Sequence, residues 1–191
     1  LRYDPPPLPG IEALWGSSVF HCAFCDGWEV RDRSLALHAS GPGSVRSALL
    51  LAGWSNDVVL CTDGAPDPGG ELLAAAGVRV RTEPIARLAG AGGRLTQIEF
   101  AHGEPERREA LFVNTRRDQP NGLAAALGCE LTEAGTIVTD ADGRTNVAGV
   151  YAAGDAATAH SRSVANAIGT GSRVAYAVAL ERLAPVVAAA A

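Results

Sequence analysis

The sequence predicts a three-layer α/β fold, in which strands alternate with helices along the chain and form a parallel β-sheet. The prediction rests on two observations. Short β-compatible runs at 34–39 and 57–61 are separated by a glycine-containing turn and a helical pattern. A second helical pattern at 71–76 then leads into a strand at 78–81. Strands that alternate with helices in this way are typical of parallel sheets, whose strands need long crossover connections.

The remaining elements follow in chain order. We expect the strands 94–100 and 108–113 to pair as antiparallel neighbours and to cover an edge of the sheet. After residue 114 the predicted elements are a helix at 123–127, strands at 136–139 and 149–153, and a helix from about 164 to 183. Strands and helices therefore alternate along most of the chain.

Composition and charge exclude several function classes. The chain carries 16 basic and 21 acidic residues, for a net charge of -5, and its basic residues are scattered arginines. This distribution does not provide the cluster of basic residues that binds nucleic acid or anionic lipid. Apolar runs end before the ~18–20 residues that a membrane span requires. We therefore expect a soluble, cytoplasmic protein with no nucleic-acid partner and no membrane partner.

Two of the four cysteines, Cys22 and Cys25, form a Cys-x-x-Cys pair. This spacing lets the two sulfurs close a disulfide or stay a dithiol, which is the geometry of thiol–disulfide exchange. The alternatives are half of a zinc site or two buried small residues. Zinc requires a second ligand pair, and Cys61 and Cys129 stand alone. Asp26 follows the pair, where a carboxylate can move protons or cap a helix.

A glycine-containing turn follows the strand 34–39, where dinucleotide-binding (Rossmann-like) folds hold a pyrophosphate. A full fingerprint has three glycines. Here Ala39 replaces the first, Gly41 keeps the second, and Ser44 stands at the third. Asp63 ends the next strand, where an acidic side chain binds a ribose hydroxyl or simply forms an Asp-Gly turn. The turn alone leaves nicotinamide binding open.

A further carboxylate follows a strand in the last third of the chain. The run 145–153 has the pattern of a turn and a buried strand, and Gly154-Asp155 comes directly after it. The carboxyl end of a strand is where open α/β sheets bind ligands, although an Asp there also caps helices. Asp155 is therefore a candidate binding residue.

The segment 22–27, Cys-x-x-Cys-Asp-Gly, together with the Trp-Gly-x-x-Val pattern at 15–19, resembles the low-molecular-weight thioredoxin reductase family. The resemblance implies that Cys22 exchanges with the substrate disulfide and that Cys25 faces a flavin. It also implies that Asp26 is the acid–base group. These roles are carried over position by position from the family's motif.

The run 145–155 resembles the second flavin-binding motif of the same family. The resemblance implies that FAD is the cofactor, with Gly154 and Asp155 at its ribityl chain. The family's flavin-side helix falls on Arg162, Ser163 and Val164. Thioredoxin reductases that bind NADPH carry an arginine cluster after the second strand, whereas the turn 62–64 has none. NAD(P)H therefore stays open as a cofactor, with NADH, no nicotinamide, or electron transfer to oxygen as the alternatives.

The resemblance also divides the chain into three parts. It implies a connector at 1–18, a nicotinamide-type dinucleotide-binding domain with the Cys-x-x-Cys pair at 19–110, and the C-terminal half of an FAD-binding domain at 111–191. The family's N-terminal FAD half has no counterpart in this sequence. We therefore expect either a fragment of a longer reductase or a short form that cannot hold FAD tightly by itself.

The leading prediction is a flavin-dependent disulfide oxidoreductase that moves electrons between FAD and a disulfide through Cys22 and Cys25. The expected partner is a thioredoxin-like protein or a small-molecule disulfide or dithiol, and the family implies a homodimer. Two alternatives stay open. A dithiol oxidase of the same fold would pass electrons to oxygen, and a non-catalytic remnant would keep the fold without holding FAD.

Overall fold

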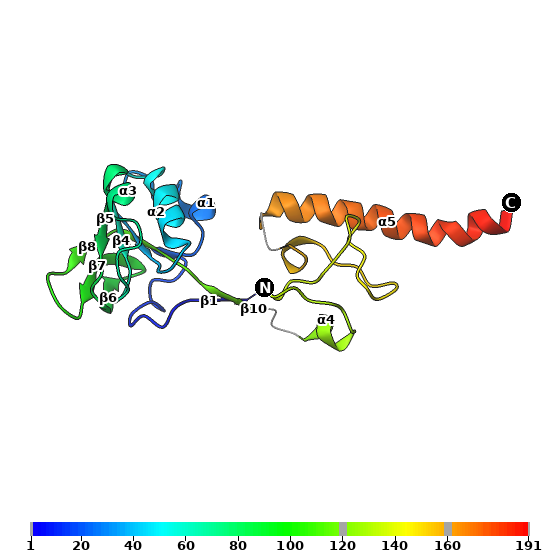
Figure 1. Ribbon diagram of the computed structural model, residues 1–191, viewed down its shortest axis with the longest axis horizontal. Coiled ribbons are helices and arrows are strands. Elements are labelled where there is room, and N and C mark those ends of the chain that lie inside the picture. Colours follow the sequence, from blue (N-terminus) through cyan, green and yellow to red (C-terminus); the bar gives the residue numbers. More distant parts are fainter. Residues whose placement is uncertain (1, 119–121, 159–161, 191) are drawn as a thin grey trace. The chain divides into compact units, whose positions relative to one another are not determined.

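The computed structural model describes residues 2–118, 122–158 and 162–190 (Figure 1). The chain forms two compact units. One spans Asp4–Arg116, and the other comprises Leu1–Tyr3 together with Arg117–Ala191. The boundary between the units therefore falls after the strand at 110–113, whereas the sequence places it near residue 110.

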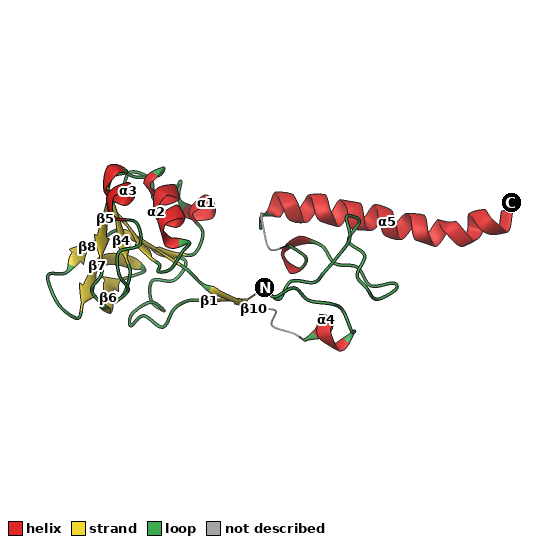
Figure 2. Cartoon of the chain, in the orientation of Figure 1, coloured by secondary structure: helices red, strands yellow, loops and turns green. Residues whose placement is uncertain are grey.

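The unit Asp4–Arg116 is built on a five-stranded sheet whose paired strands are all parallel (Figure 2). The strand order across the sheet is β2 (Val19–Phe20), β9 (Ala110–Val113), β3 (Leu35–His38), β4 (Val58–Cys61) and β5 (Val78–Arg81). In the register of neighbouring strands, His38 lies beside Cys61. The predicted Rossmann-like α/β fold is confirmed.

Two further layers cover the faces of this sheet. One face carries the helices α1 (Ala23–Asp26), α2 (Ser44–Ala52) and α3 (Gly70–Ala75). The other face carries an antiparallel sheet of β6 (Ile85–Ala91), β7 (Arg94–Phe100) and β8 (Glu106–Arg107). Alternate residues of a strand face opposite layers, so Leu35 and Leu37 pack against the helices while Ala36 packs against β6 and β7.

Two sequence predictions about strands are wrong. The segment 108–113 does not pair with 94–100, because β9 lies inside the parallel sheet between β2 and β3. All four residues of β9 are buried, as in strands that are covered on both faces. The antiparallel partners of β7 are β8, directly before the predicted segment, and β6, a strand that was not predicted. These antiparallel strands cover a face of the parallel sheet rather than its edge.

The N-terminal residues do more than connect. Strand β1 (Arg2–Asp4) pairs with β10 (Arg116–Asp118). Leu8, Ile11 and Leu14 are then buried in the core between the parallel sheet and β6–β7. The segment predicted as a connector at 1–18 therefore supplies side chains to the core. Their burial stabilises the fold, since burying apolar surface is the main favourable term in folding.

The second unit contains little regular sheet. Its described helical elements are α4 (Leu123–Ala126), the 3-10 turn η1 (Gly154–Ala156) and the long helix α5 (Val164–Ala190). Its described strand residues belong to the β1–β10 pair. The predicted strands 136–139 and 149–153 form only isolated bridges, from Leu131 to Ile137 and from Arg144 to Tyr151. Among the described residues, neither segment has a neighbouring strand with which to form a continuous hydrogen-bonded ladder.

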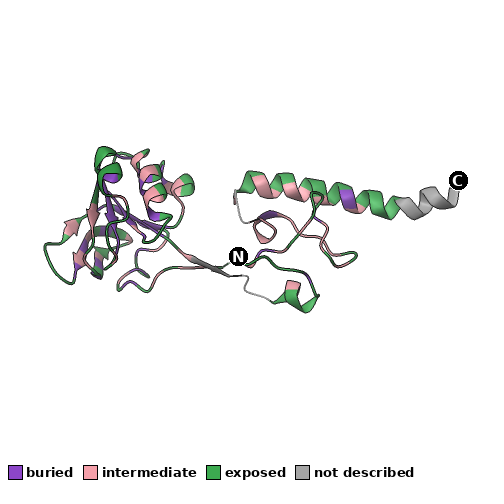
Figure 3. Ribbon diagram, in the orientation of Figure 1, coloured by how far each residue is buried: buried purple, intermediate pink, exposed green. Residues whose placement is uncertain are grey.

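Most of the described side chains of α5, those of residues 164–183, are exposed or half-buried (Figure 3). The large apolar side chains exposed among them are Val164, Ile168, Tyr176, Leu180 and Leu183. None of the helices in the described part of the chain combines the length and apolar character that crossing a membrane requires.

Candidate functional site

The Cys22–Cys25 pair lies at the start of α1 and forms a disulfide. Cys22 is the N-cap residue in an extended conformation. Its carbonyl accepts hydrogen bonds from the Cys25 and Asp26 N–H groups, both at 3.1 Å. One helical turn places residues three apart on the same face, which brings the sulfurs together. Cys25 is exposed and Cys22 is half-buried, so a reacting partner can reach the disulfide.

Asp26 ends α1 directly after Cys25. Burial raises the pKa of its carboxyl group, a nearby His21 acts in the lowering direction, and Glu29 raises it further. The His21 ring also stacks on Trp15, with the ring centroids 6.2 Å apart. A raised pKa moves the carboxyl toward the range in which it can both hold and release a proton beside a thiol.

Gly27 follows Asp26 at a point of very close packing. A Cβ atom at this position would lie 2.3 Å from the Ala23 carbonyl oxygen and 2.7 Å from the Trp54 Nε1 atom. The absence of a side chain at Gly27 therefore lets the indole of Trp54 pack closely against the end of α1. Trp28, the next residue, is 60% exposed and carries the Arg31 guanidinium 3.9 Å from its ring centroid.

The glycine turn joins β3 to α2 in the same unit. Gly41 has φ +78°, a conformation that favours glycine, and a Cβ there would meet nothing within 4 Å. Ser44 is the first residue of α2 and is buried, and its hydroxyl donates to the Gly41 carbonyl at 2.7 Å. Ala39 is also buried, and its N–H donates to the Cys61 carbonyl oxygen at 3.2 Å. The turn therefore leaves free space beside the backbone at Gly41.

Asp63 stands after β4, next to the glycine turn in the parallel sheet. Its Oδ1 atom accepts a hydrogen bond from the Ile85 N–H at 2.7 Å, and its Oδ2 lies 3.2 Å from His38 Nε2. The backbone of Asp63 has φ +53°, as expected of an Asp-Gly turn. Both carboxylate oxygens therefore already have protein partners. The predicted contact of Asp63 with a ribose stays a prediction.

Gly154 and Asp155 begin η1 in the second unit. Gly154 is buried with φ +64°, and its N–H donates to the Thr170 hydroxyl on α5 at 2.9 Å. The Tyr3 hydroxyl donates to Asp155 Oδ2 at 3.4 Å, a long contact that leaves the carboxylate with further acceptor capacity. This turn therefore holds Asp155 beside α5.

The residues before and at the start of α5 lie in the same unit. Arg162 Nε is buried and has no partner among the residues that the structure describes. The Ser163 hydroxyl accepts from the Asn166 N–H at 3.1 Å, and Val164 is 77% exposed. His160 lies outside the described residues.

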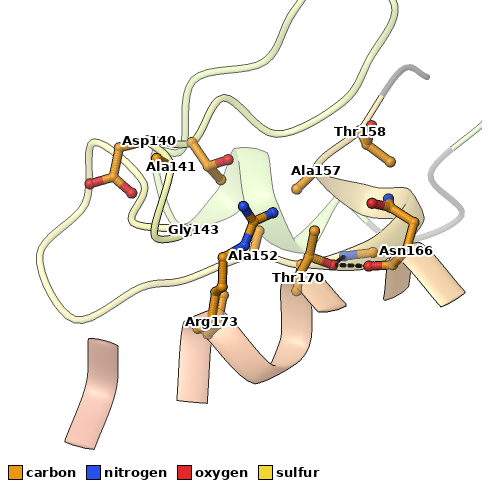
Figure 4. A pocket seen from close by; sticks show the side chains of 13 residues that line it. Asp140, Ala141, Gly143, Ala152, Ala157, Thr158, Asn166, Thr170 and Arg173 are labelled. Carbon is orange, nitrogen blue, oxygen red and sulfur yellow. Dashed lines mark hydrogen bonds between the residues drawn. The ribbon is translucent and has the colours of Figure 1, made fainter. Parts of the chain in front are cut away.

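A pocket of about 230 Å³ lies beside Gly154 (Figure 4). The loop 139–143 lines one side and α5 lines the other, and the Arg173 side chain extends from the helix toward the loop. Asn166 and Thr170 complete its polar lining on the helix. The pocket is smaller than the ~300–1,000 Å³ of sites that enclose a drug-sized ligand.

The predicted site residues thus fall into three groups. Cys22, Cys25 and Asp26 are adjacent on α1, and the group Gly41, Ser44 and Asp63 lies where parallel strands end. The group Gly154, Asp155, Arg162, Ser163 and Val164 lies in the other unit. The His21–Trp15 stack was not predicted from the sequence. Its only signal is the position of His21 immediately before the Cys-x-x-Cys pair.

Comparison with known proteins places the chain in a family. Residues 69–171 match the sequence profile of the pyridine nucleotide-disulphide oxidoreductases, which is more than half of the 191 residues. The chain belongs to this family. Pyridine nucleotide-disulphide oxidoreductases, as the name states, combine a nicotinamide nucleotide with disulfide chemistry, and the Cys22–Cys25 disulfide agrees with that class.

Individual relatives agree with the family. The chain is 34% identical over 175 residues to thioredoxin reductase tcpT of Claviceps purpurea (strain 20.1), which covers 86% of this chain and 54% of the relative. It is 29% identical over 169 residues to thioredoxin reductase sirT of Leptosphaeria maculans, covering 80% of this chain and 52% of the relative. The chain thus spans about half the length of these curated relatives.

Solved structures share the fold. The structure of HlmI has a TM-score of 0.88 and 37% identity, covering 99% of this chain and 60% of that one. An oxidoreductase from Agrobacterium tumefaciens has a TM-score of 0.85 and 32% identity, covering 96% of this chain and 62% of that one. These likenesses extend over both compact units of this oxidoreductase chain.

Proposed function

We propose that the chain is the dithiol-bearing part of a flavin-dependent disulfide oxidoreductase that resembles thioredoxin reductase. The accessible Cys22–Cys25 disulfide beside Asp26 carries the proposal. The thioredoxin reductases among the relatives support it, and they also support a thioredoxin-like protein as partner. Because the chain spans about half the length of those relatives, the activity is proposed for the whole protein.

The proposed chemistry is thiol–disulfide exchange. In the reduced protein the Cys22 thiolate attacks one sulfur of a substrate disulfide and releases one substrate thiol. The Cys25 thiolate then attacks the Cys22 sulfur and releases the second substrate thiol. The protein dithiol is oxidised to the Cys22–Cys25 disulfide by two electrons, and the substrate disulfide is reduced by two.

Asp26 is the proposed acid–base residue for this exchange. It follows Cys25 directly. Because its pKa is raised, its carboxyl group keeps a proton up to a higher pH than an exposed Asp does. Such a group can take the proton of the Cys25 thiol and return one to a leaving thiolate.

FAD is the proposed redox cofactor, and part of a site for it can be argued from this chain. When bound, FAD takes up or gives the two electrons of the dithiol. Gly154 and Asp155 would hold its polar chain, because the Asp155 carboxylate keeps free acceptor capacity. The start of α5, with Arg162, Ser163 and Val164, would face its ring, and the unpartnered Arg162 Nε fits a polar ligand there. The 230 Å³ pocket accommodates only part of such a molecule.

A thermal unfolding experiment tests this cofactor proposal. A ligand that binds only the folded state must raise the unfolding temperature. We expect FAD to raise the midpoint of the full-length protein and to raise that of its Asp155→Ala variant less. A midpoint of the full-length protein that does not move at high FAD concentration would favour the non-catalytic remnant.

A dithiol oxidase of the same fold is the second candidate. Two features at the carboxyl ends of β3 and β4 favour it: both oxygens of Asp63 already have protein partners, and Ala39 stands at the first fingerprint glycine. Both features weaken a nicotinamide site. Oxygen consumption by the full-length, FAD-loaded protein with a dithiol and without NAD(P)H would identify the oxidase, whereas dependence on NAD(P)H would identify the reductase. The family resemblance further supports a homodimer, which sedimentation would test. The cytoplasmic location stays a prediction from the sequence.

A further inference from the structure

Two large aromatic side chains are exposed beside the Cys22–Cys25 disulfide. Phe24, which stands between the two cysteines, is 76% exposed, and Trp28, three residues after Cys25, is 60% exposed. Among the described side chains of the unit Asp4–Arg116, these two are the most exposed of the large apolar ones. Exposed aromatic surface gains none of the stabilisation that burial provides, so a pair of such side chains beside a reactive group indicates a binding surface.

The helical turn of α1 brings this aromatic pair, Phe24 and Trp28, next to the disulfide. The turn continues through Gly27, which has helical backbone angles and whose N–H donates to the Ala23 carbonyl at 3.0 Å. Residues three or four apart on a helix are neighbours, with about 5–6 Å between their Cβ atoms. Trp28 is therefore a neighbour of Cys25, three residues before it, and of Phe24, four residues before it. The aromatic pair and the disulfide thus belong to one surface.

The Trp28 ring is held in place. The Arg31 guanidinium lies 3.9 Å from the ring centroid, and Arg31 Nη1 donates to the Trp28 carbonyl at 2.7 Å. The turn itself is also fixed, since Gly27 packs against Trp54 and the Asp32 N–H donates to the Trp54 carbonyl at 2.9 Å. Trp28 remains 60% exposed with Arg31 in place, so much of the indole is accessible to a ligand. A ring that is ordered before binding loses little side-chain entropy when it binds.

The size of this surface fits a small molecule better than a protein. A whole aromatic side chain buries about 150–250 Å², so the exposed parts of Phe24 and Trp28 together present roughly 200–350 Å². A stable protein interface takes about 800 Å² from each partner. The aromatic pair therefore matches a single ring system rather than a protein surface.

The charges near the aromatic pair do not select for a charged ligand. The charged residues that follow Cys25 in this turn are Asp26, Glu29 and Arg31, which carry both signs. Arg31 is engaged with Trp28, and burial raises the pKa of the Asp26 carboxyl group, which favours its neutral form. Contacts between rings are therefore the main source of recognition that this surface offers.

We propose that Phe24 and Trp28 bind an aromatic ring of a small disulfide or dithiol substrate whose sulfur atoms react at Cys22 and Cys25. The inference rests on the proposed function and names its substrate class. A flat aromatic group stacks on Phe and Trp rings or packs edge-to-face against them, whereas a saturated ring of similar size gains only the burial of apolar surface. The protein then selects its substrate by the ring beside the reacting sulfur.

Three probe disulfides that differ in one group test the inference. They are the symmetric disulfides of N-benzoyl, N-cyclohexanecarbonyl and N-acetyl cysteamine, whose sulfur atoms have the same chemical neighbours. In the full-length Cys25→Ser protein, the Cys22 thiolate attacks one probe sulfur, forms a mixed disulfide and releases the other half of the probe as a thiol. Mass spectrometry gives the rate of adduct formation at Cys22, which is divided by the rate of glutathione with the same probe. We expect the benzoyl probe to react roughly two- to tenfold faster than the cyclohexanecarbonyl probe.

Variants locate the effect at the aromatic pair. Phe24→Leu and Trp28→Leu keep an apolar side chain and remove the ring, so each should bring the ratio of the benzoyl rate to the cyclohexanecarbonyl rate closer to one. Leu72→Ala is the matched control and should keep the ratio, because Leu72 is an apolar residue on α3 that is also exposed, at 57%.

The outcomes separate this inference from the proposed function. Equal normalised rates for the benzoyl and cyclohexanecarbonyl probes, or a preference that survives both variants, would overturn the inference. Oxidised thioredoxin serves as a fourth probe. A rate that falls in Trp28→Leu for thioredoxin but not for the benzoyl probe would assign the surface to a protein partner and would also overturn the inference. Absence of an adduct at Cys22 with every probe would overturn the proposed function instead.

Discussion

At the scale of single residues, a glycine permits close packing directly after the dithiol. Gly27 lets the chain pass between the Ala23 carbonyl and the Trp54 indole directly after the Cys-x-x-Cys turn. The sequence predicts Cys22, Cys25 and Asp26 as a group, because their adjacency needs only one helical turn. The role of Trp54 could not be predicted, since it is brought to Gly27 by the packing of α2 against the sheet.

A Gly27→Ala variant tests this packing. Its Cβ would lie 2.7 Å from Trp54 Nε1 and 2.3 Å from the Ala23 carbonyl oxygen, so the indole or the helix must shift. We expect a loss of about 1–3 kcal/mol in the free energy of unfolding, measured by urea denaturation. Gly43→Ala is the control, because a Cβ there meets nothing within 4 Å. Equal stability of the two variants would contradict the packing.

The raised pKa of Asp26 predicts a pH dependence of stability. In the pH range between the ordinary and the raised pKa, the folded state keeps a proton that the unfolded state has lost. The stabilising contribution is therefore complete at low pH and is lost as pH rises through the folded-state pKa. We expect the urea midpoint of Asp26→Asn to rise relative to that of the wild type as the pH is raised from about 3 to about 7. A difference that stays constant with pH would show that the Asp26 pKa is not raised.

At the scale of elements, the local patterns predict β3, β4, β5 and the helices between them. They fail at β9, because its short apolar run is compatible with either sheet and only tertiary packing places it between β2 and β3. Strand β6 is missed because its exposed arginine and small residues weaken the apolar alternation. The antiparallel layer therefore could not be predicted from the local sequence patterns.

The residues just before β9 also hold a buried charge, which gives a prediction for this part of the sheet. Arg108 is 2% exposed, and its guanidinium bonds to Asp57 at 2.8 Å and to Glu106. Arg108→Ala removes two charge-assisted hydrogen bonds and the packing of a buried side chain, while Glu106 keeps its ion pairs with Arg79 and Arg81.

We expect Arg108→Ala to lower the free energy of unfolding by about 1–3 kcal/mol. Arg87→Ala, which breaks the exposed pair with Glu99, should change it little, and the opposite ranking would contradict the assignment of the buried network.

At the scale of the whole molecule, the chain belongs to the pyridine nucleotide-disulphide oxidoreductase family and spans about half the length of its first curated relatives. The dithiol lies in one compact unit and the predicted flavin residues lie in the other. The sequence predicts both motifs because each is local. It cannot predict the exposure of Phe24 and Trp28, which depends on how the rest of the unit packs around α1.

The central claim is that Cys22 and Cys25 form an exchanging dithiol, and trapping a mixed disulfide tests it most directly. Cys25→Ser removes the thiol that resolves the intermediate, so a disulfide substrate should stay attached to Cys22. Burial raises the pKa of the Cys61 thiol to about 12, which makes it a poor competitor. Peptide mapping by mass spectrometry is expected to find the adduct on Cys22 alone. An adduct on Cys61 or Cys129 instead, or no adduct on Cys22, would contradict the account.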